Sequence, residues 1–231
     1  MEASRPGVPG PGAGAREADV APAPDPTGGR TAGIWAPADP GPLGLAAFAA
    51  TTFVLSMINA NLVAGPLTDV PVVLGLALAY GGITQLIAGI WEFRTGNTFG
   101  AVAFCSFGAF WISFYILVKV ALAKPALGGL AASHIDSAVG LYLWTWAIFT
   151  TYMFVASLRT TGAIALVFFL LAATFILLGA GNSGADLNMI KWGGYVGIAT
   201  AIAAWYASFA AVINSTFGRV IAPVVPLKRT P

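Results

Sequence analysis

The stretch YGGITQLIAGIWEFRTGNTFG, residues 80–100, decides the fold of this chain. It begins as an apolar run rich in Ile, Leu, Ala and Gly, passes through a short polar segment, and enters a second apolar run at Phe99. Gln85 interrupts the first run, and Glu92 and Arg94 lie at its end. Two apolar runs joined by so short a turn indicate neighbouring antiparallel helices. The polar residues between them are candidates for function.

The composition is that of a membrane protein. Of the 231 residues, 58% are hydrophobic and only 9% are charged, whereas about a quarter of an ordinary soluble domain is charged. A helix of about 20 apolar residues crosses the roughly 30 Å hydrocarbon layer of a bilayer. Six runs of about this length contain no charged residue. They are residues 43–63, 71–91, 99–118, 137–158, 162–181 and 192–213.

We therefore predict an all-α membrane protein with six transmembrane helices, because the strands of a membrane β-barrel are about half as long and alternate in polarity. Residues 39–216 form the predicted six-helix transmembrane domain. Residues 1–38 are rich in Pro, Gly and Ala and lack apolar periodicity, so we predict a disordered cytoplasmic tail. Residues 217–231 are predicted to form a short cytoplasmic tail.

Lys and Arg are distributed unevenly between the two predicted sides. With the N-terminus in the cytoplasm, the inner side holds eight basic residues and the outer side three. Basic residues concentrate in the cytoplasmic loops of membrane proteins. The distribution therefore predicts a multi-pass protein of the cell (plasma) membrane with both termini in the cytoplasm.

Short matching segments follow the even-numbered helices. NTFG ends at Gly100, STFG ends at Gly218, and TTG ends at Gly162. This spacing predicts three helix hairpins of about 60 residues each, arranged around a central pathway as in transporters built from repeats.

The residues that usually carry catalysis are scarce. Cys105 and His134 are single, so the chain has neither a nucleophile–base pair nor a cluster of metal ligands. We expect no enzymatic activity, no cofactor, no metal and no nucleic-acid partner.

Polar groups at membrane depth are the remaining candidates. The amide of Gln85 has several groups to satisfy, and it is explained equally well by helix packing and by a transport pathway. Asn97 and Thr98 begin the third predicted helix, where they cap it or touch a ligand. Glu92 and Arg94 are expected to pair at the end of the second helix, at its exposed cytoplasmic side.

Five segments together resemble the acetate uptake transporter family, which includes the bacterial succinate–acetate permeases. The segment DPGPLGLAAFAATTFVLSMINA is similar to the N-terminal signature Asn-Pro-Ala-Pro-Leu-Gly-Leu of that family. YGGITQLIAGIWEFRTGNTFGAVAFCSFGAFW is similar to its most characteristic block, and GLYLWTWAIFTTYMF, VFFLLAATFILLGAGN and FGR also match. The resemblance covers residues 38–220 and is identified mainly by the long second block.

The resemblance implies a six-helix protomer that assembles into a homo-hexamer in the lipid bilayer. It also implies a central pathway for acetate and related small carboxylates such as succinate, propionate and lactate. An apolar pore constriction is expected at Phe48, Phe107 and Leu171. The pathway or its mouth is expected at Pro42, Gly44, Gln85, Asn97, Thr98 and Ala204.

Two departures from the family pattern affect this pathway. Asp39 and Gly41 replace the Asn and the Ala of the signature, and Asp39 places a carboxylate where an acetate ion would be repelled. Many relatives have Tyr where this chain has Phe107, so the constriction here is fully apolar.

A bare carboxylate entering a low dielectric costs on the order of 20 kcal/mol in idealised estimates. The six runs hold no Lys or Arg to offset that cost. We therefore predict that the neutral acid passes and that transport is linked to proton movement. Three alternatives stay open: an anion channel for acetate, an ammonia or ammonium pathway, and an acetate-sensing membrane protein.

Overall fold

The structure, a computed structural model, describes residues 37–63, 70–122 and 132–227. Within these residues the regular elements are helices. They are α1 (Gly41–Asn59), α2 (Val70–Leu78), the π-helix η1 (Ala79–Thr84), α3 (Gln85–Thr95), α4 (Thr98–Leu122), α5 (Ala132–Ser157), α6 (Gly162–Ser183) and α7 (Leu187–Phe217). The predicted disordered tail, residues 1–38, lies outside the described residues except for its last two positions.

The six predicted membrane helices are confirmed. In the described residues, six helical segments are long and apolar enough to cross a bilayer. They are Gly41–Asn59, Val72–Thr95, Thr98–Val120, Ser137–Ser157, Gly162–Ser183 and Leu187–Phe217. The last segment begins five residues before the predicted run, because Asp186 caps it by accepting hydrogen bonds from the backbone N–H groups of Asn188 and Met189.

The sequence predicts a single helix for the second span, but the structure does not have one continuous α-helix there. The span consists of α2, η1 and α3, with the π-helical turn in the middle. Two glycines let this turn approach its neighbours: a Cβ atom at position 81 would lie 2.6 Å from the hydroxyl oxygen of Thr51 in α1, and one at position 82 would lie 2.8 Å from Ile112 in α4. Single π-turns are frequent at functional sites, and this one ends directly before Gln85.

The turn between α3 and α4 is short because Gly96 adopts a left-handed conformation, with φ at +76°. The backbone N–H of Asn97 donates to the carbonyl of Glu92 at 3.1 Å. The side-chain oxygen of Asn97 then accepts from the backbone N–H of Gly100 at 3.1 Å, which caps α4. Glu92 and Asn97 are thereby held at the same end of the helix pair.

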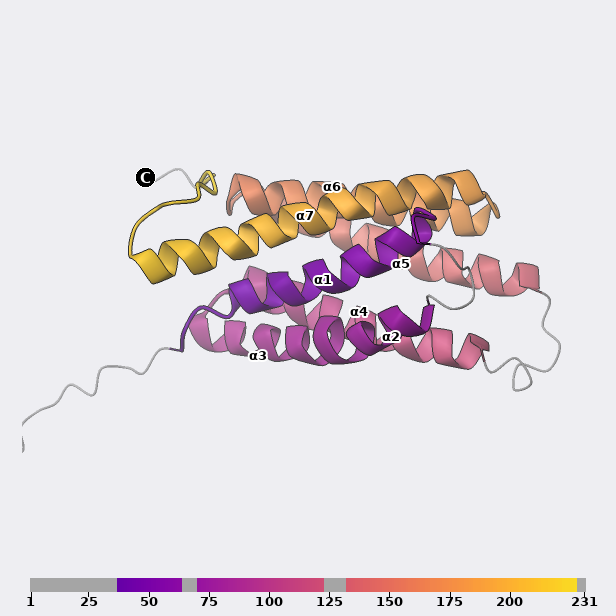
Figure 1. The fold of residues 1–231 in the computed structure, drawn as a ribbon, viewed down its shortest axis with the longest axis horizontal. Helices are drawn as coiled ribbons and strands as arrows, with labels where there is room; N and C mark the ends of the chain where they lie inside the picture. The colour runs from indigo at the N-terminus through magenta and orange to yellow at the C-terminus, as the bar shows by residue number, and fades with distance from the viewer. Residues whose placement is uncertain (1–36, 64–69, 123–131, 228–231) are drawn as a thin grey trace, which may run out of the picture. The chain divides into compact units, whose positions relative to one another are not determined.

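Helix α1 lies between two groups of helices, as Figure 1 shows. It packs along α7 on one side and against η1 and α3 on the other, while α6 packs against both α5 and α7. The backbones of α4 and α5 approach each other at few positions. The arrangement into three hairpin repeats therefore stays a prediction.

The described end of the chain folds back on the helices. Asn214 in α7 accepts from the backbone N–H groups of Ile221 and Ala222 and donates to the carbonyl of Ala222. Further along, Gly162 donates to the carbonyl of Val225 at 2.7 Å. Residues 219–227 thus cover the turn between α5 and α6, whereas the sequence had predicted only a short tail there.

Candidate functional site

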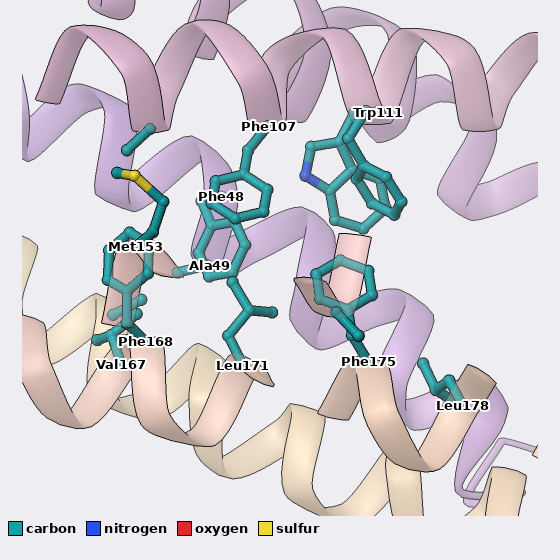
Figure 2. Close-up of a cluster of buried hydrophobic side chains, with 14 of the residues drawn as sticks. Phe48, Ala49, Phe107, Trp111, Met153, Val167, Phe168, Leu171, Phe175 and Leu178 are labelled. Atoms are coloured by element: carbon teal, nitrogen blue, oxygen red, sulfur yellow. The ribbon is translucent and has the colours of Figure 1, made fainter. Parts of the chain in front are cut away.

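A small cavity of about 20 Å³ lies in the middle of the helices. It is lined by all three residues of the predicted constriction, Phe48 from α1, Phe107 from α4 and Leu171 from α6. Figure 2 shows the three side chains pointing toward one another from their separate helices. We call them the apolar ring. A cavity of this volume has room for about one water molecule.

Aromatic side chains pack around Phe107 and hold it in place. Its centroid lies 5.8 Å from that of Phe48 and 5.3 Å from that of Phe149. Phe168 and Phe175 of α6 approach at 6.1 and 6.4 Å. These distances are those of favourable aromatic pairs. The apolar ring is therefore closed by well-packed side chains.

Gln85 is the one polar residue among the described residues that line the small cavity. Its side chain is 1% exposed, and its Oε1 atom has no hydrogen-bond partner within the described part of the chain. A buried carbonyl oxygen left unpaired costs about 1–3 kcal/mol. Because Gln85 is the first residue of α3, the π-turn before it fixes where this amide enters the cavity.

A larger cavity of about 340 Å³ adjoins the small one, and we call it the vestibule. Its walls come from the N-terminal ends of α1, α4 and α6 and the C-terminal ends of α3 and α7. The two cavities share four lining residues, which are Leu45, Ala103, Phe104 and Phe168. The vestibule therefore adjoins the small cavity at these four residues.

Three of the shared residues form a second apolar layer, which we call the second ring. Leu45, Phe104 and Phe168 each precede one member of the apolar ring by three positions on the same helix. Three residues correspond to about 4.5 Å along a helix and return to the same face. The second ring thus lies between the vestibule and the apolar ring.

The vestibule is more polar than the small cavity. Its polar lining residues are Asp39, Glu92, Asn97, Thr160, Thr161 and Asn214. Glu92 is 1% exposed, and its Oε2 atom accepts hydrogen bonds from Asn97 at 2.9 Å and Thr95 at 3.1 Å. Its Oε1 atom has no hydrogen-bond partner within the described residues. Asp39 accepts from the backbone N–H of Gly41 at 2.9 Å.

The predicted mouth residues differ in their placement. Pro42 and Asn97 line the vestibule. Gly44 lies behind the second ring, where a Cβ atom would come within 2.7 Å of the Phe104 ring. Ala204 is fully buried and belongs to the same apolar cluster as the apolar ring, but it lines neither cavity. Thr98 is exposed and also lines neither cavity.

The polar end of the second span differs from expectation in one respect. Glu92 is buried in the vestibule wall rather than exposed, because α4 and the first turn of α1 cover it. Arg94 is exposed, and its pairing with Glu92 stays a prediction. The second ring was not among the predicted site residues, although the three-residue spacing from each member of the apolar ring indicates it.

Comparison with known proteins identifies relatives of this chain. A family model described as the GPR1/FUN34/yaaH family matches residues 31–229. The chain is 43% identical to acetate permease A of Emericella nidulans, over 84% of this chain and 68% of that protein. It is 45% identical to ammonia transport outward protein 2 of Saccharomyces cerevisiae, over 76% of this chain and 61% of that protein. This chain thus spans under two thirds of the length of that yeast relative.

This chain matches almost the full length of its bacterial relatives. The chain is 37% identical to the succinate-acetate/proton symporter SatP of Escherichia coli, over 81% of this chain and 95% of that protein. The solved structure of the bacterial acetate channel SatP superposes with a TM-score of 0.74 at 34% identity, covering 81% of this chain and 99% of the other. With six confirmed spans and a family model that matches nearly its whole length, this chain is a multi-pass membrane protein of the GPR1/FUN34/yaaH family.

Proposed function

We propose that this protein transports acetate and related small carboxylates across the membrane as the neutral acid, so that each carboxyl group carries one proton. The observation that carries the proposal is the sequence of environments along one path. A vestibule with six polar lining residues adjoins the second ring, and the apolar ring follows. Both rings line a cavity whose single polar lining group is the amide of Gln85. Relatives named as acetate permease, symporter and channel support the same substrate class.

The chemistry of the narrow part favours an acid over its anion. Among the described residues, neither cavity is lined by Lys or Arg. A carboxylate in the apolar ring would therefore lose its hydration without gaining a positive partner, at a cost that idealised estimates place on the order of 20 kcal/mol. The neutral acid avoids most of that cost.

Gln85 supplies a further reason for this preference. Its unpaired Oε1 atom can accept a hydrogen bond from the hydroxyl group of a carboxylic acid, whereas a carboxylate has no hydrogen to donate. We infer that Phe48, Phe107 and Leu171 set the width of the pathway and that Gln85 orients the acid within it. Pro42, Gly44, Asn97, Thr98 and Ala204 are proposed to shape the pathway and its mouth, directly or through their neighbours.

The cellular setting is part of the same proposal. The distribution of basic residues supports a plasma membrane protein with both termini in the cytoplasm, which places the vestibule on the cytoplasmic side. Assembly into a homo-hexamer is proposed from the family resemblance. We propose no enzymatic activity and no nucleic-acid partner for this chain.

Passage of ammonia is the second candidate function. Two carboxyl side chains, Asp39 and Glu92, line the vestibule and would attract ammonium more readily than acetate. One relative is named as an ammonia transport outward protein. Competition separates the two functions, because propionate would slow acetate transport through a carboxylate pathway and would leave ammonia passage unchanged.

The test is uptake of radiolabelled acetate and succinate into vesicles that contain the purified protein, with and without an inward proton gradient. We expect uptake above that of empty vesicles and accumulation driven by the gradient. Leu171→Ala widens the apolar ring and is expected to raise succinate uptake relative to acetate. Leu166→Ala, an exposed position on the same helix, is the matched control and should leave the ratio unchanged. No uptake above empty vesicles would contradict the proposal.

A further inference from the structure

Two carboxyl groups meet near the first turn of α1, at the wall of the vestibule. A Cβ atom built at Gly41 would lie 3.0 Å from Oδ1 of Asp39 and 3.5 Å from Oε1 of Glu92. Asp39 is exposed, whereas Glu92 is 1% exposed. The second carboxyl group is therefore removed from bulk water while it lines the cavity that leads to the apolar ring.

The two oxygens of Glu92 are treated differently by the protein. Oε2 accepts from the amide nitrogen of Asn97, whose orientation is fixed because its own oxygen accepts from the backbone of Gly100. Oε1 has no partner among the described residues. In a neutral carboxyl group one oxygen accepts hydrogen bonds and the other carries the proton. The environment of Glu92 matches that division, with Oε1 as the oxygen that exchanges a proton.

Glycine residues of two other helices pack closely against this carboxyl group. A Cβ atom at Gly100 would lie 2.7 Å from both Cδ and Oε1 of Glu92 and 2.6 Å from the amide nitrogen of Asn97. Gly41 of α1 also lies close to this group, because a Cβ atom there would be 3.5 Å from Oε1. At these two positions, α1 and α4 approach the carboxyl group without a side chain.

The charges around Glu92 favour its neutral form. Asp39 is the other titratable residue among the described residues that line the vestibule, and its negative charge opposes a second one nearby. Arg159 before α6 and Arg219 after α7 are exposed and do not line the vestibule. Burial acts in the same direction, because removing a charged carboxylate from water is costly.

We propose that Glu92 is the proton exchange site of this transporter, taking the proton from each acid that leaves the apolar ring and returning one to each carboxylate that enters it. This proposal rests on the proposed function. During uptake the neutral Glu92 first releases the proton on Oε1 to vestibule water. The O–H bond of the acid then breaks and an O–H bond forms again at Oε1, which restores the neutral Glu92 and leaves the free carboxylate in the vestibule. Export runs through the same steps in reverse.

Two measurements test this role. The first is infrared spectroscopy of the purified protein at neutral pH, which detects the carbonyl band of a protonated carboxyl group. We expect a band that is lost in Glu92→Gln and kept in Asp39→Asn. The second is uptake of succinate, which crosses empty vesicles slowly, recorded together with the internal pH. Glu92→Gln should slow proton-linked uptake by about 100-fold or more, and Glu92→Asp should restore part of it with a changed pH profile.

The outcomes distinguish this proposal from the proposed function. A Glu92→Gln protein that is folded and moves acid and protons at the wild-type rate would overturn the role of Glu92 and leave the transport function intact. A wild-type protein without uptake above empty vesicles would overturn both. Retention of substrate binding in Glu92→Gln, measured by the change in tryptophan fluorescence on adding acetate, would support a role in proton exchange rather than in folding.

Discussion

The two adjoining cavities of this protein differ in size and in chemistry. The vestibule measures about 340 Å³ and has six polar lining residues, whereas the cavity at the apolar ring measures about 20 Å³ and has only Gln85. They share four lining residues, so an acid would pass from one environment to the other within a few ångströms. Under the proposed function, the two cavities divide the roles: charge is handled in the vestibule, and the neutral molecule is selected in the apolar ring.

The largest effect on this division of roles is expected from removing the single polar group of the small cavity. Gln85→Leu should slow transport about 10- to 100-fold, because the acid loses the acceptor for its hydroxyl group. The same change removes an unpaired buried carbonyl, so the free energy of unfolding should stay equal or rise. Uptake into vesicles and thermal unfolding in detergent measure the two effects.

A control lies one residue away. Thr84 is half-buried, and its hydroxyl bonds to the carbonyl of Ala79 within the π-turn. Thr84→Val should leave transport nearly unchanged. If Gln85→Leu lost transport and stability together, a purely structural role for the amide would replace the proposed one.

A second prediction concerns the space around Glu92 in the vestibule. Gly100→Ala places a methyl group 2.7 Å from the Glu92 carboxyl group, and relieving that overlap should cost about 1–3 kcal/mol of the free energy of unfolding. Proton-linked uptake should fall as well. Gly75→Ala is the matched control, since a Cβ atom there meets nothing within 4 Å and should stabilise α2 by up to about 1 kcal/mol. Equal stability of the two variants would contradict the packing described here.

A third prediction concerns a substitution that adds a polar group to the apolar ring. Phe107→Tyr adds a hydroxyl group beside a cavity that offers Gln85 as a polar neighbour. A new hydrogen bond to Oε1 of Gln85 would satisfy that atom and compete with the acid. We therefore expect a changed ratio of acetate to succinate uptake and a stability change within about 1.5 kcal/mol. Unchanged ratios across both substrates would show that Phe107 does not contact the acid.

The smallest expected effect is at the edge of the vestibule. Asn214→Ala removes three hydrogen bonds that hold residues 221 and 222 against α7. Because this segment is largely exposed, we expect a loss of about 1 kcal/mol or less and faster hydrogen exchange at residues 221 and 222. Unaltered exchange at these positions would mean that other contacts hold the segment.

Much of the fold could be predicted from the sequence because it depends on local composition. Six uncharged runs of membrane length become six spans, since a bilayer leaves few other solutions for such runs. The family motifs and the polar groups at membrane depth predict Phe48, Phe107, Leu171 and Gln85 as pathway residues. In the structure these four residues line one cavity. Their role in transport stays a proposal.

The features that the sequence did not reveal depend on contacts between distant segments. The π-turn before Gln85 contains Gly81 and Gly82, which pack closely on α1 and α4, and no local sequence pattern reports those contacts. Glu92 looks like an ordinary helix-end charge, but Gly41 and Gly100 of two other helices allow it to be buried. The folding back of residues 219–227 depends on Asn214, a residue that resembles any polar group at a helix end.

The most direct test of the central claim is whether an electric potential drives transport. Acetate uptake into vesicles with the purified protein would be measured at fixed pH on both sides, with a potential imposed by a potassium gradient and valinomycin. If the neutral acid passes, the protein-dependent uptake should be independent of the potential and accompanied by one proton per acid. If the anion passes, a potential of about 100 mV should bias its distribution by about 2.3 kcal/mol, or about 50-fold, and that result would contradict the account.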